Sequence, residues 1–154
     1  AVFTDESLDS YALNAAYTGD NYGVSVTYGV VETDTTNEDT YTAFNAYYLP
    51  EGSNLPSLSV GYEIGDIGGA AATADEKTSF MVGLSWDEVG PGSAGIALGH
   101  SSTVEGTDEL LMYEAFYSYS VNDGMTITPL VYIKEFASGT DDETGLMVKT
   151  SFSF

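Results

Sequence analysis

The chain has 154 residues, enough for a single domain of ordinary size, and its 24 acidic residues against three basic ones give a formal net charge of −21. That balance excludes a basic nucleic-acid-binding surface and adhesion to anionic lipid headgroups through a polybasic face. The absence of cysteine removes disulfides, thiolate metal sites and cysteine nucleophiles. No apolar run approaches the roughly 20 residues of a membrane-spanning helix.

Alternation of apolar and polar residues in the first half of the chain predicts four β-strands, because successive strand residues point to opposite faces. The tight turn Gly19-Asp20-Asn21 separates the first two strands, and residues 33–39 form a polar, acidic loop. The turn Pro50–Pro56 follows the third strand. The expected strands are residues 8–18, 22–30, 40–49 and 58–64.

The second half continues the pattern with five more strands. A loop rich in Gly, Ala and Asp spans residues 65–77, and polar loops are expected at 101–109 and 135–144. Asp123-Gly124 is a strong hairpin signal, while Pro129 indicates an edge strand or a bulge because proline cannot donate to a β-ladder. The expected strands are residues 80–86, 94–99, 111–119, 127–133 and 145–154.

Parity along these strands predicts which side chains share a face. We expect one apolar face on the outside of a curved sheet and one polar face on the inside. The outward set is Val24, Val26, Val60, Phe80, Val82, Leu84, Leu98 and Val148, and the inward set is Ser25, Thr27, Ser59, Gly83, Gly95 and Lys149.

Two regularities favour a transmembrane β-barrel over a secreted sandwich. Short turns are expected after strands one, three, five and seven, and longer acidic loops after strands two, four, six and eight, as in outer-membrane barrels. Aromatic residues gather beside the short turns, where an interfacial girdle would lie. They are Tyr17, Tyr22, Tyr47, Tyr48, Trp86, Tyr117, Tyr119, Phe152 and Phe154.

The expected count of nine strands is odd, whereas single-chain bacterial barrels have an even number. We therefore expect residues 1–154 to be the C-terminal portion of a larger barrel, with no separate second domain. A start at Ala1 rather than Met also predicts a processed or partial chain. The alternative is a short tenth strand within residues 1–7.

Several short motifs resemble the barrel of cyanobacterial outer-membrane porins, of the carbohydrate-selective or iron-uptake porin family. The motifs are Tyr41-Thr42-Ala43-Phe44-Asn45-Ala46-Tyr47-Tyr48, Ser59-Val60-Gly61-Tyr62-Glu63, Ser85-Trp86, Met125–Tyr132 and the ending Phe152-Ser153-Phe154. The resemblance implies an antiparallel barrel of 16 strands in the outer membrane, contact with outer-membrane lipid and a homo-trimer. It also implies an N-terminal peptidoglycan-binding segment, which these residues do not contain.

Catalysis finds no support in the residues, and we expect no enzyme. His100 is the single histidine, so an imidazole pair cannot hold a metal, and no Gly-x-Ser-x-Gly motif surrounds the serines beside it. We expect His100 to be interfacial or solvated. The acidic clusters at Asp66, Asp75-Glu76 and Asp141-Asp142-Glu143 offer oxygen ligands for a loosely held calcium ion, without the spacing of an EF-hand.

The expected function is a water-filled pore for passive diffusion of small hydrophilic solutes, carbohydrates or inorganic ions, with a preference for cations set by the acidic loops. Parity nominates the polar pore-lining residues Asn14, Asn45, Glu63, Glu114, Lys134 and Lys149. The competing hypothesis is a secreted, acidic, all-β structural subunit of a surface layer or filament.

Overall fold

The computed structural model describes residues 8–34, 36–51, 54–69, 74–137 and 139–153, which form nine β-strands and, among these residues, no helix. The expectation of an all-β, antiparallel fold is thereby confirmed. Within the described ranges no helix has the length and apolar character to cross a membrane. The strands are β1 (Ser10–Thr18), β2 (Tyr22–Glu32), β3 (Glu38–Tyr48), β4 (Ser57–Asp66), β5 (Glu76–Val89), β6 (Gly92–Val104), β7 (Leu111–Asn122), β8 (Met125–Lys134) and β9 (Glu143–Phe152).

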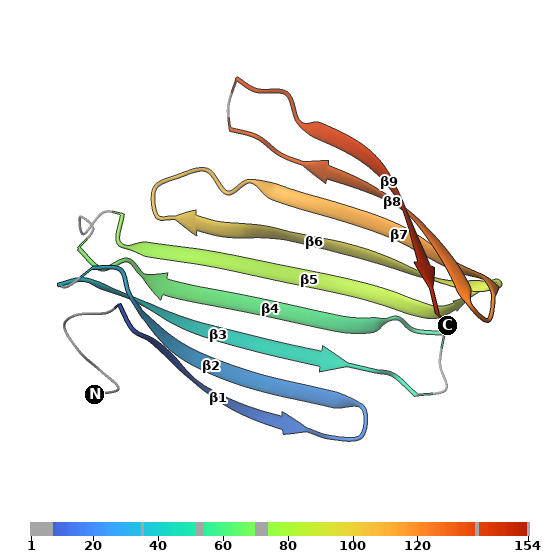
Figure 1. Cartoon of the computed structure of the whole chain (residues 1–154), viewed down its shortest axis with the longest axis horizontal. Coiled ribbons are helices and arrows are strands. Elements are labelled where there is room, and N and C mark those ends of the chain that lie inside the picture. The colour runs from blue at the N-terminus through green and yellow to red at the C-terminus, as the bar shows by residue number, and fades with distance from the viewer. Residues whose placement is uncertain (1–7, 35, 52–53, 70–73, 138, 154) are drawn as a thin grey trace.

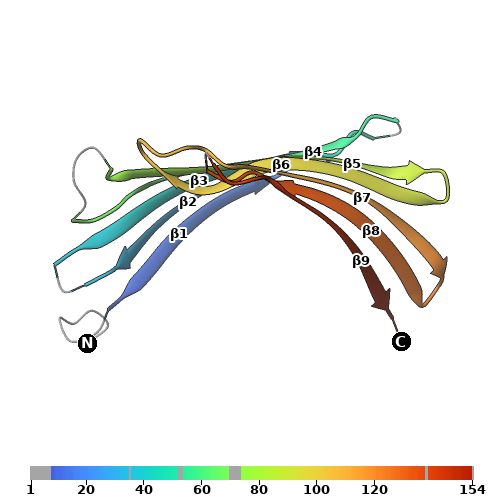
Figure 2. The same ribbon diagram turned by 90° about the horizontal axis from the view of Figure 1, so that it is seen from above.

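All nine strands belong to one sheet, in which each strand pairs antiparallel with the next along the chain (Figure 1). The sheet bends into an arch when seen from above, with β1 and β9 on its two flanks (Figure 2). It does not close, because β1 and β9 do not pair with each other in the described residues. A tenth strand within residues 1–7 would lie outside the described residues.

Pairing carries side-chain parity unchanged from strand to strand. Val26 lies opposite Phe44, and Phe44 opposite Tyr62, so apolar residues face apolar residues across the sheet. The apolar face so formed includes Val24, Val26, Phe44, Val60, Tyr62, Phe80, Val82, Leu84, Ile96, Leu98, Tyr113, Val131, Leu146 and Val148. The polar face includes Ser25, Thr27, Asn45, Ser59, Gly61, Gly83, Gly95, Ala97, Glu114, Thr128 and Lys149. The expected outward and inward sets therefore lie on opposite faces, as the alternation predicted.

Exposure shows which face is convex, because side chains spread apart on a convex surface and crowd together on a concave one. Val24 and Val26 are 47% and 38% exposed, yet the smaller Ser25 between them is only half-exposed. Gly23 and Gly95 on the polar face are buried. The apolar face is therefore the outer side of the arch and the polar face its hollow.

Connections between strands gather at two ends of the sheet. The described residues of the turn end are 19–21, 49–51, 54–56, 90–91 and 123–124, and those of the loop end are 33–34, 36–37, 67–69, 74–75, 105–110, 135–137 and 139–142. The expected alternation of short and long connections is wrong after β3, since 49–56 is longer than 33–37. Each turn-end connection is nonetheless shorter than the loop-end connection that follows it, including 49–56 before 67–75.

The strands are staggered along the sheet. Tyr22, the first residue of β2 at the turn end, lies in a row of partners that reaches Leu146 in β9, six residues before the turn end of that strand at Phe152. Six residues are about 20 Å along a strand, and seven strand spacings are about 34 Å. If the turn ends lie in one plane, the strands tilt by about 30°, close to the tilt of closed barrels.

Pro129 does not mark an edge or a bulge, contrary to the expectation from its missing N–H. It lies inside β8, which pairs with β7 on one side and β9 on the other, and it is itself the partner of Val148. The sheet accommodates it through a local gap in the β7–β8 ladder, between the pairs Phe116–Leu130 and Tyr119–Ile127. Within that gap the hydroxyls of Ser118 and Thr128 hydrogen-bond at 3.0 Å.

Aromatic rings on the polar face lie across glycines of neighbouring strands. A Cβ atom at Gly23 would collide with the Tyr47 ring, and one at Gly95 with the Phe116 ring. The same relation joins Gly65 to Tyr41 and Gly145 to Tyr132. Each glycine thus leaves room for an aromatic side chain to lie over the backbone of the neighbouring strand on the polar face.

Two glycines of β2 make a matched pair for testing this packing. Gly23→Ala should lower the free energy of unfolding by about 1–2 kcal/mol, since the Tyr47 ring has to move away. Gly29→Ala, whose Cβ would lie 3.6 Å from the Tyr11 carbonyl oxygen, should change it by at most about 1 kcal/mol and in the stabilising direction. Equilibrium unfolding in urea measures both, and equal losses at the two positions would contradict the ring-over-glycine arrangement.

Candidate functional site

The polar face is the candidate functional site, because all six nominated residues lie on it. Asn14 pairs with Thr27, Asn45 with Ser25, and Glu63 with Ala43. Glu114 is opposite Ala97, Lys134 opposite Met112, and Lys149 opposite Thr128. Between them the face consists mainly of Ser, Thr, Gly and Ala, so it offers hydroxyl and backbone groups over a broad hollow.

These residues share a face without converging on one point. Asn14 donates from Nδ2 to the Thr27 hydroxyl at 2.7 Å and to the Val26 carbonyl at 3.3 Å. Asn45 places its Oδ1 over Gly61, at 3.0 Å from where a Cβ would be. Glu63 and Glu114 lie on β4 and β7 with β5 and β6 between them. The six residues are therefore spread over the face from β1 to β9.

Acidic groups concentrate at the loop end. The described acids there are Asp9, Glu32, Asp34, Glu38, Asp39, Asp66, Asp75, Glu76, Glu105, Asp108, Glu109, Glu135, Asp141, Asp142 and Glu143, whereas the turn end has Asp20, Glu51, Asp87, Glu88 and Asp123. Like charges even face each other across strands, as in the pair Asp66–Glu76. The field along the sheet is therefore asymmetric and more negative at the loop end.

Local hydrogen bonding keeps one of these loop carboxylates, Asp34, negatively charged at acidic pH. The Asp34 carboxylate accepts hydrogen bonds from the Asn37 side-chain amide at 2.7 Å and from the Thr36 and Asn37 backbone N–H groups at 2.7 and 2.9 Å. The Asn37 side chain, followed by Thr36, lowers the pKa of Asp34 to about 2. The negative charge of this loop therefore persists at any ordinary pH.

An ion pair at the loop end escaped the sequence analysis. Lys77 Nζ lies 3.0 Å from Asp39 Oδ2 and 2.6 Å from the Tyr41 hydroxyl, and 4.5 Å from the centroid of the Tyr41 ring. The Tyr41 hydroxyl in turn donates to Asp39 Oδ2 at 3.0 Å. Asp39 is 7% exposed. The three side chains form a nearly enclosed cluster on the polar face.

Two features position this cluster. Tyr41, Gly65 and Lys77 are successive partners across β3, β4 and β5, and the glycine leaves the space in which the Tyr41 ring and the lysine meet. The backbone N–H of Gly68 donates to Asp39 Oδ1 at 3.0 Å. The cluster therefore fastens the start of the β4–β5 connection to β3.

Calcium ligation by the last acidic loop is not supported by the geometry. Glu143 accepts a hydrogen bond from the Tyr132 hydroxyl at 2.7 Å, and Asp142 accepts one from the Phe136 backbone N–H at 3.4 Å. Across the part of the chain that the structure describes, no three His, Cys, Asp or Glu side chains group in a way that could hold a metal ion. Asp141, Asp142 and Glu143 do not form a ligand set.

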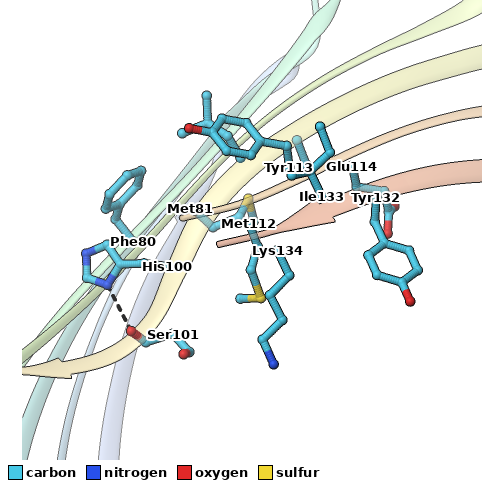
Figure 3. Close-up of a pocket in the computed structure, with 13 residues that line it drawn as sticks. Phe80, Met81, His100, Ser101, Met112, Tyr113, Glu114, Tyr132, Ile133 and Lys134 are labelled. Atoms are coloured by element: carbon cyan, nitrogen blue, oxygen red, sulfur yellow. Dashed lines mark hydrogen bonds between the residues drawn. The ribbon is translucent and has the colours of Figure 1, made fainter. Parts of the chain in front are cut away.

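His100 is buried, which corrects the expectation of an interfacial or solvated side chain. It is 5% exposed and meets the Phe80 ring edge-on, with centroids 4.8 Å apart (Figure 3). Its Nδ1 lies 2.8 Å from the Ser101 carbonyl and 3.0 Å from the Thr103 hydroxyl. The β5–β6 register shifts beside it, between Thr78 and Phe80. The buried histidine is therefore next to an irregularity of the β5–β6 ladder.

Aromatic residues form a band on the apolar face at the turn end. Tyr17 and Tyr22 have ring centroids 5.9 Å apart, and Tyr17 and Phe152 are 59% and 62% exposed. Tyr48, Trp86, Tyr117 and Tyr119 continue the band, whereas Tyr47 is on the polar face. Phe154 lies outside the described residues. The aromatic clustering noted in the sequence is thus mostly one-sided.

No family model, curated protein or solved structure matches the chain.

The enclosed ion pair gives a stability prediction. Lys77→Met should lower the free energy of unfolding by about 2–3 kcal/mol, because it leaves the Asp39 carboxylate enclosed without a cation. The double variant Lys77→Met/Asp39→Asn should recover part of that loss. Lys149→Gln, which removes an exposed lysine from the same face, should change stability by less than about 0.5 kcal/mol. Urea unfolding of the four proteins checks this, and equal effects of Lys77→Met and Lys149→Gln would refute it.

Proposed function

We propose that the sheet is part of the wall of an outer-membrane β-barrel pore, in which the apolar face contacts lipid and the polar face lines water. The observation that carries the proposal is the segregation of apolar side chains onto one continuous face of nine strands. Leu13, Leu146 and Val148 on that face are 75%, 77% and 58% exposed. Soluble monomers rarely expose apolar patches larger than a few hundred Å², so such a face requires a cover.

Lipid is the cover that fits the strand geometry. Strands of 9–14 residues are long enough to cross a bilayer, which takes about 9–11 residues in a tilted strand. The stagger supports a tilt of about 30°, near the 35–45° of transmembrane barrels. On β1, β2 and β7 the apolar face carries tyrosines six residues apart: Tyr11 and Tyr17, Tyr22 and Tyr28, Tyr113 and Tyr119. That is about 20 Å along a strand, somewhat less than the roughly 25 Å band between aromatic girdles.

The polar face fits passive diffusion of small hydrophilic solutes and ions. Ser, Thr and Asn side chains and the small Gly residues allow a permeating solute to keep its hydration. The loop end of the lining is strongly acidic, so it should concentrate cations and deplete anions, with an influence that decays over about 8 Å at physiological ionic strength. Glu63 and Glu114 extend this negative lining between the ends.

A secreted structural subunit is the competing function. It would have to cover the apolar face with a second protein layer, and the described residues contain only one sheet. Its signature would be a water-soluble assembly formed without detergent. The pore instead requires the chain to enter lipid.

Selectivity tests the proposal. Reversal potentials in planar bilayers under a salt gradient should show preference for potassium over chloride, decreasing as salt rises because exposed charges are screened. Glu114→Gln should reduce the preference more than Asp108→Asn, since Glu114 is on the lining and Asp108 is in an exposed connection. The control is the single-channel conductance at high salt, which both variants should leave nearly unchanged.

Two results would overturn the account. Absence of any channel activity from the complete barrel that contains these residues would refute the proposal of a pore. Channels with anion preference would show that Lys134, Lys149 or residues outside this sheet determine selectivity, and that the acidic loops do not.

A further inference from the structure

An apolar row interrupts the polar face near the β9 edge. Phe116, Leu130 and Met147 are successive cross-strand partners on β7, β8 and β9. Such partners have Cβ atoms about 4.5–5.5 Å apart, so the three residues form a continuous row, which we call the strip, and its Phe116 ring extends over Gly95 of β6. Met147 is 54% exposed, and Phe116 and Leu130 are half-exposed. No comparable strip occurs on the polar face of β1 and β2, where the residues are Ser, Thr, Ala, Asn and Gly apart from Val31 at the loop end.

The adjacent row toward the turn end is polar and carries a cation. Ser118, Thr128 and Lys149 lie one row beyond Phe116, Leu130 and Met147. The Ser118 and Thr128 hydroxyls are 3.0 Å apart, and Thr128 is the partner of Lys149. Lys149 is exposed and forms no ion pair within the described residues, in contrast to Lys77.

An exposed lysine without a neighbouring acid is unusual in a chain of net charge −21. Lys134 is the other lysine on this face without an ion pair in the described ranges, and its surroundings differ. Its Nζ lies 4.9 Å from the centroid of the Phe136 ring, and its cross-strand partner is the acidic Glu143. Figure 3 shows Lys134 beside Met112. On the same face, Lys149 has Thr128 as its partner and Met147 and Ser151 as its neighbours along β9. It is a cation bordered by hydroxyls and apolar surface, without an acid beside it.

We propose that these two rows bind a small organic anion with an apolar body. The carboxylate of the ligand lies against the Lys149 ammonium and the Thr128 hydroxyl, and its apolar part covers Leu130 and Met147. An inorganic anion would gain nothing from the apolar row, and a neutral solute nothing from the lysine. The inference goes beyond the proposed function, since it assigns an anion-binding site within a lining that is acidic as a whole. It rests on that function only in that the polar face has to be open to solutes.

Methionine methyl groups report this binding without requiring conduction. The four methionines are Met81, Met112, Met125 and Met147. Met125 is on the apolar face, Met81 and Met112 are on the polar face away from the strip, and Met147 is in it. With the full chain folded in detergent micelles and its methionine methyls labelled with carbon-13, benzoate should shift the Met147 signal and leave Met125 in place.

The ligand series separates the two parts of the site. Benzoate should half-saturate the Met147 shift at a concentration about fivefold below that of benzyl alcohol, because a single exposed charge pair is worth up to about 1 kcal/mol. It should also half-saturate at a lower concentration than acetate, which has no ring to cover Leu130 and Met147. Lys149→Gln should raise the benzoate value to that of benzyl alcohol, and Leu130→Ser should raise it toward that of acetate. Lys134→Gln is the matched control, since it removes the same charge from the same face outside the strip, and it should leave the value unchanged.

Three results would overturn the inference. Equal shifts at Met147 and Met125 would mean partitioning of benzoate into the detergent, and equal potency of acetate would mean that only the charge matters. An equal loss with Lys134→Gln and Lys149→Gln would mean a diffuse electrostatic effect. The failure of the pore proposal is separate, since it is read from conductance in bilayers, whereas this measurement follows one methyl group.

Discussion

The whole structure depends on parity being preserved across eight consecutive antiparallel pairings. Because each residue faces its partner on the same side of the sheet, one slipped register would move an entire strand's apolar residues to the polar face. The register shifts lie near strand ends. They occur between Thr78 and Phe80, between Trp86 and Val89, and between Ser120 and Asn122. The middle of the sheet therefore keeps one face that is apolar on all nine strands.

That constraint also explains what stabilises so thin a structure. A single sheet has no enclosed core, and Val30 is the one buried apolar side chain among the described residues. Stability must come from the ladders, from rings lying over glycines such as Tyr47 over Gly23, and from the cluster of Asp39, Tyr41 and Lys77. The apolar face contributes only when something covers it, and in the proposed pore the cover is the hydrocarbon of the bilayer.

Local alternation made the strands, the two faces and the shared placement of Asn45, Glu63 and Lys149 predictable, because parity is a property of each strand alone. What depends on the pairing of distant strands was not predictable. Lys77 meets Tyr41 and Asp39 because β4 contributes Gly65 between Tyr41 and Lys77, and this follows from register rather than from either segment. His100 was misjudged because its side chain contacts the Phe80 ring of the neighbouring strand, beside a register shift that periodicity does not reveal. The strip of Phe116, Leu130 and Met147 left a sequence signal in the loss of alternation on β7 and β8, where both faces are partly apolar.

The most direct test of the central claim compares neighbouring residues of one strand in lipid. The chain has no cysteine, so single cysteines at Val26 and Thr27 each carry a spin label without background. After assembly into vesicles, oxygen, which enriches in hydrocarbon, should relax the label at 26 more strongly than the label at 27, and a water-soluble nickel chelate should do the reverse. The pair Leu98 and Ala97 should repeat the result on β6. Equal accessibility to the chelate at 26 and 27 would contradict a lipid-facing apolar face.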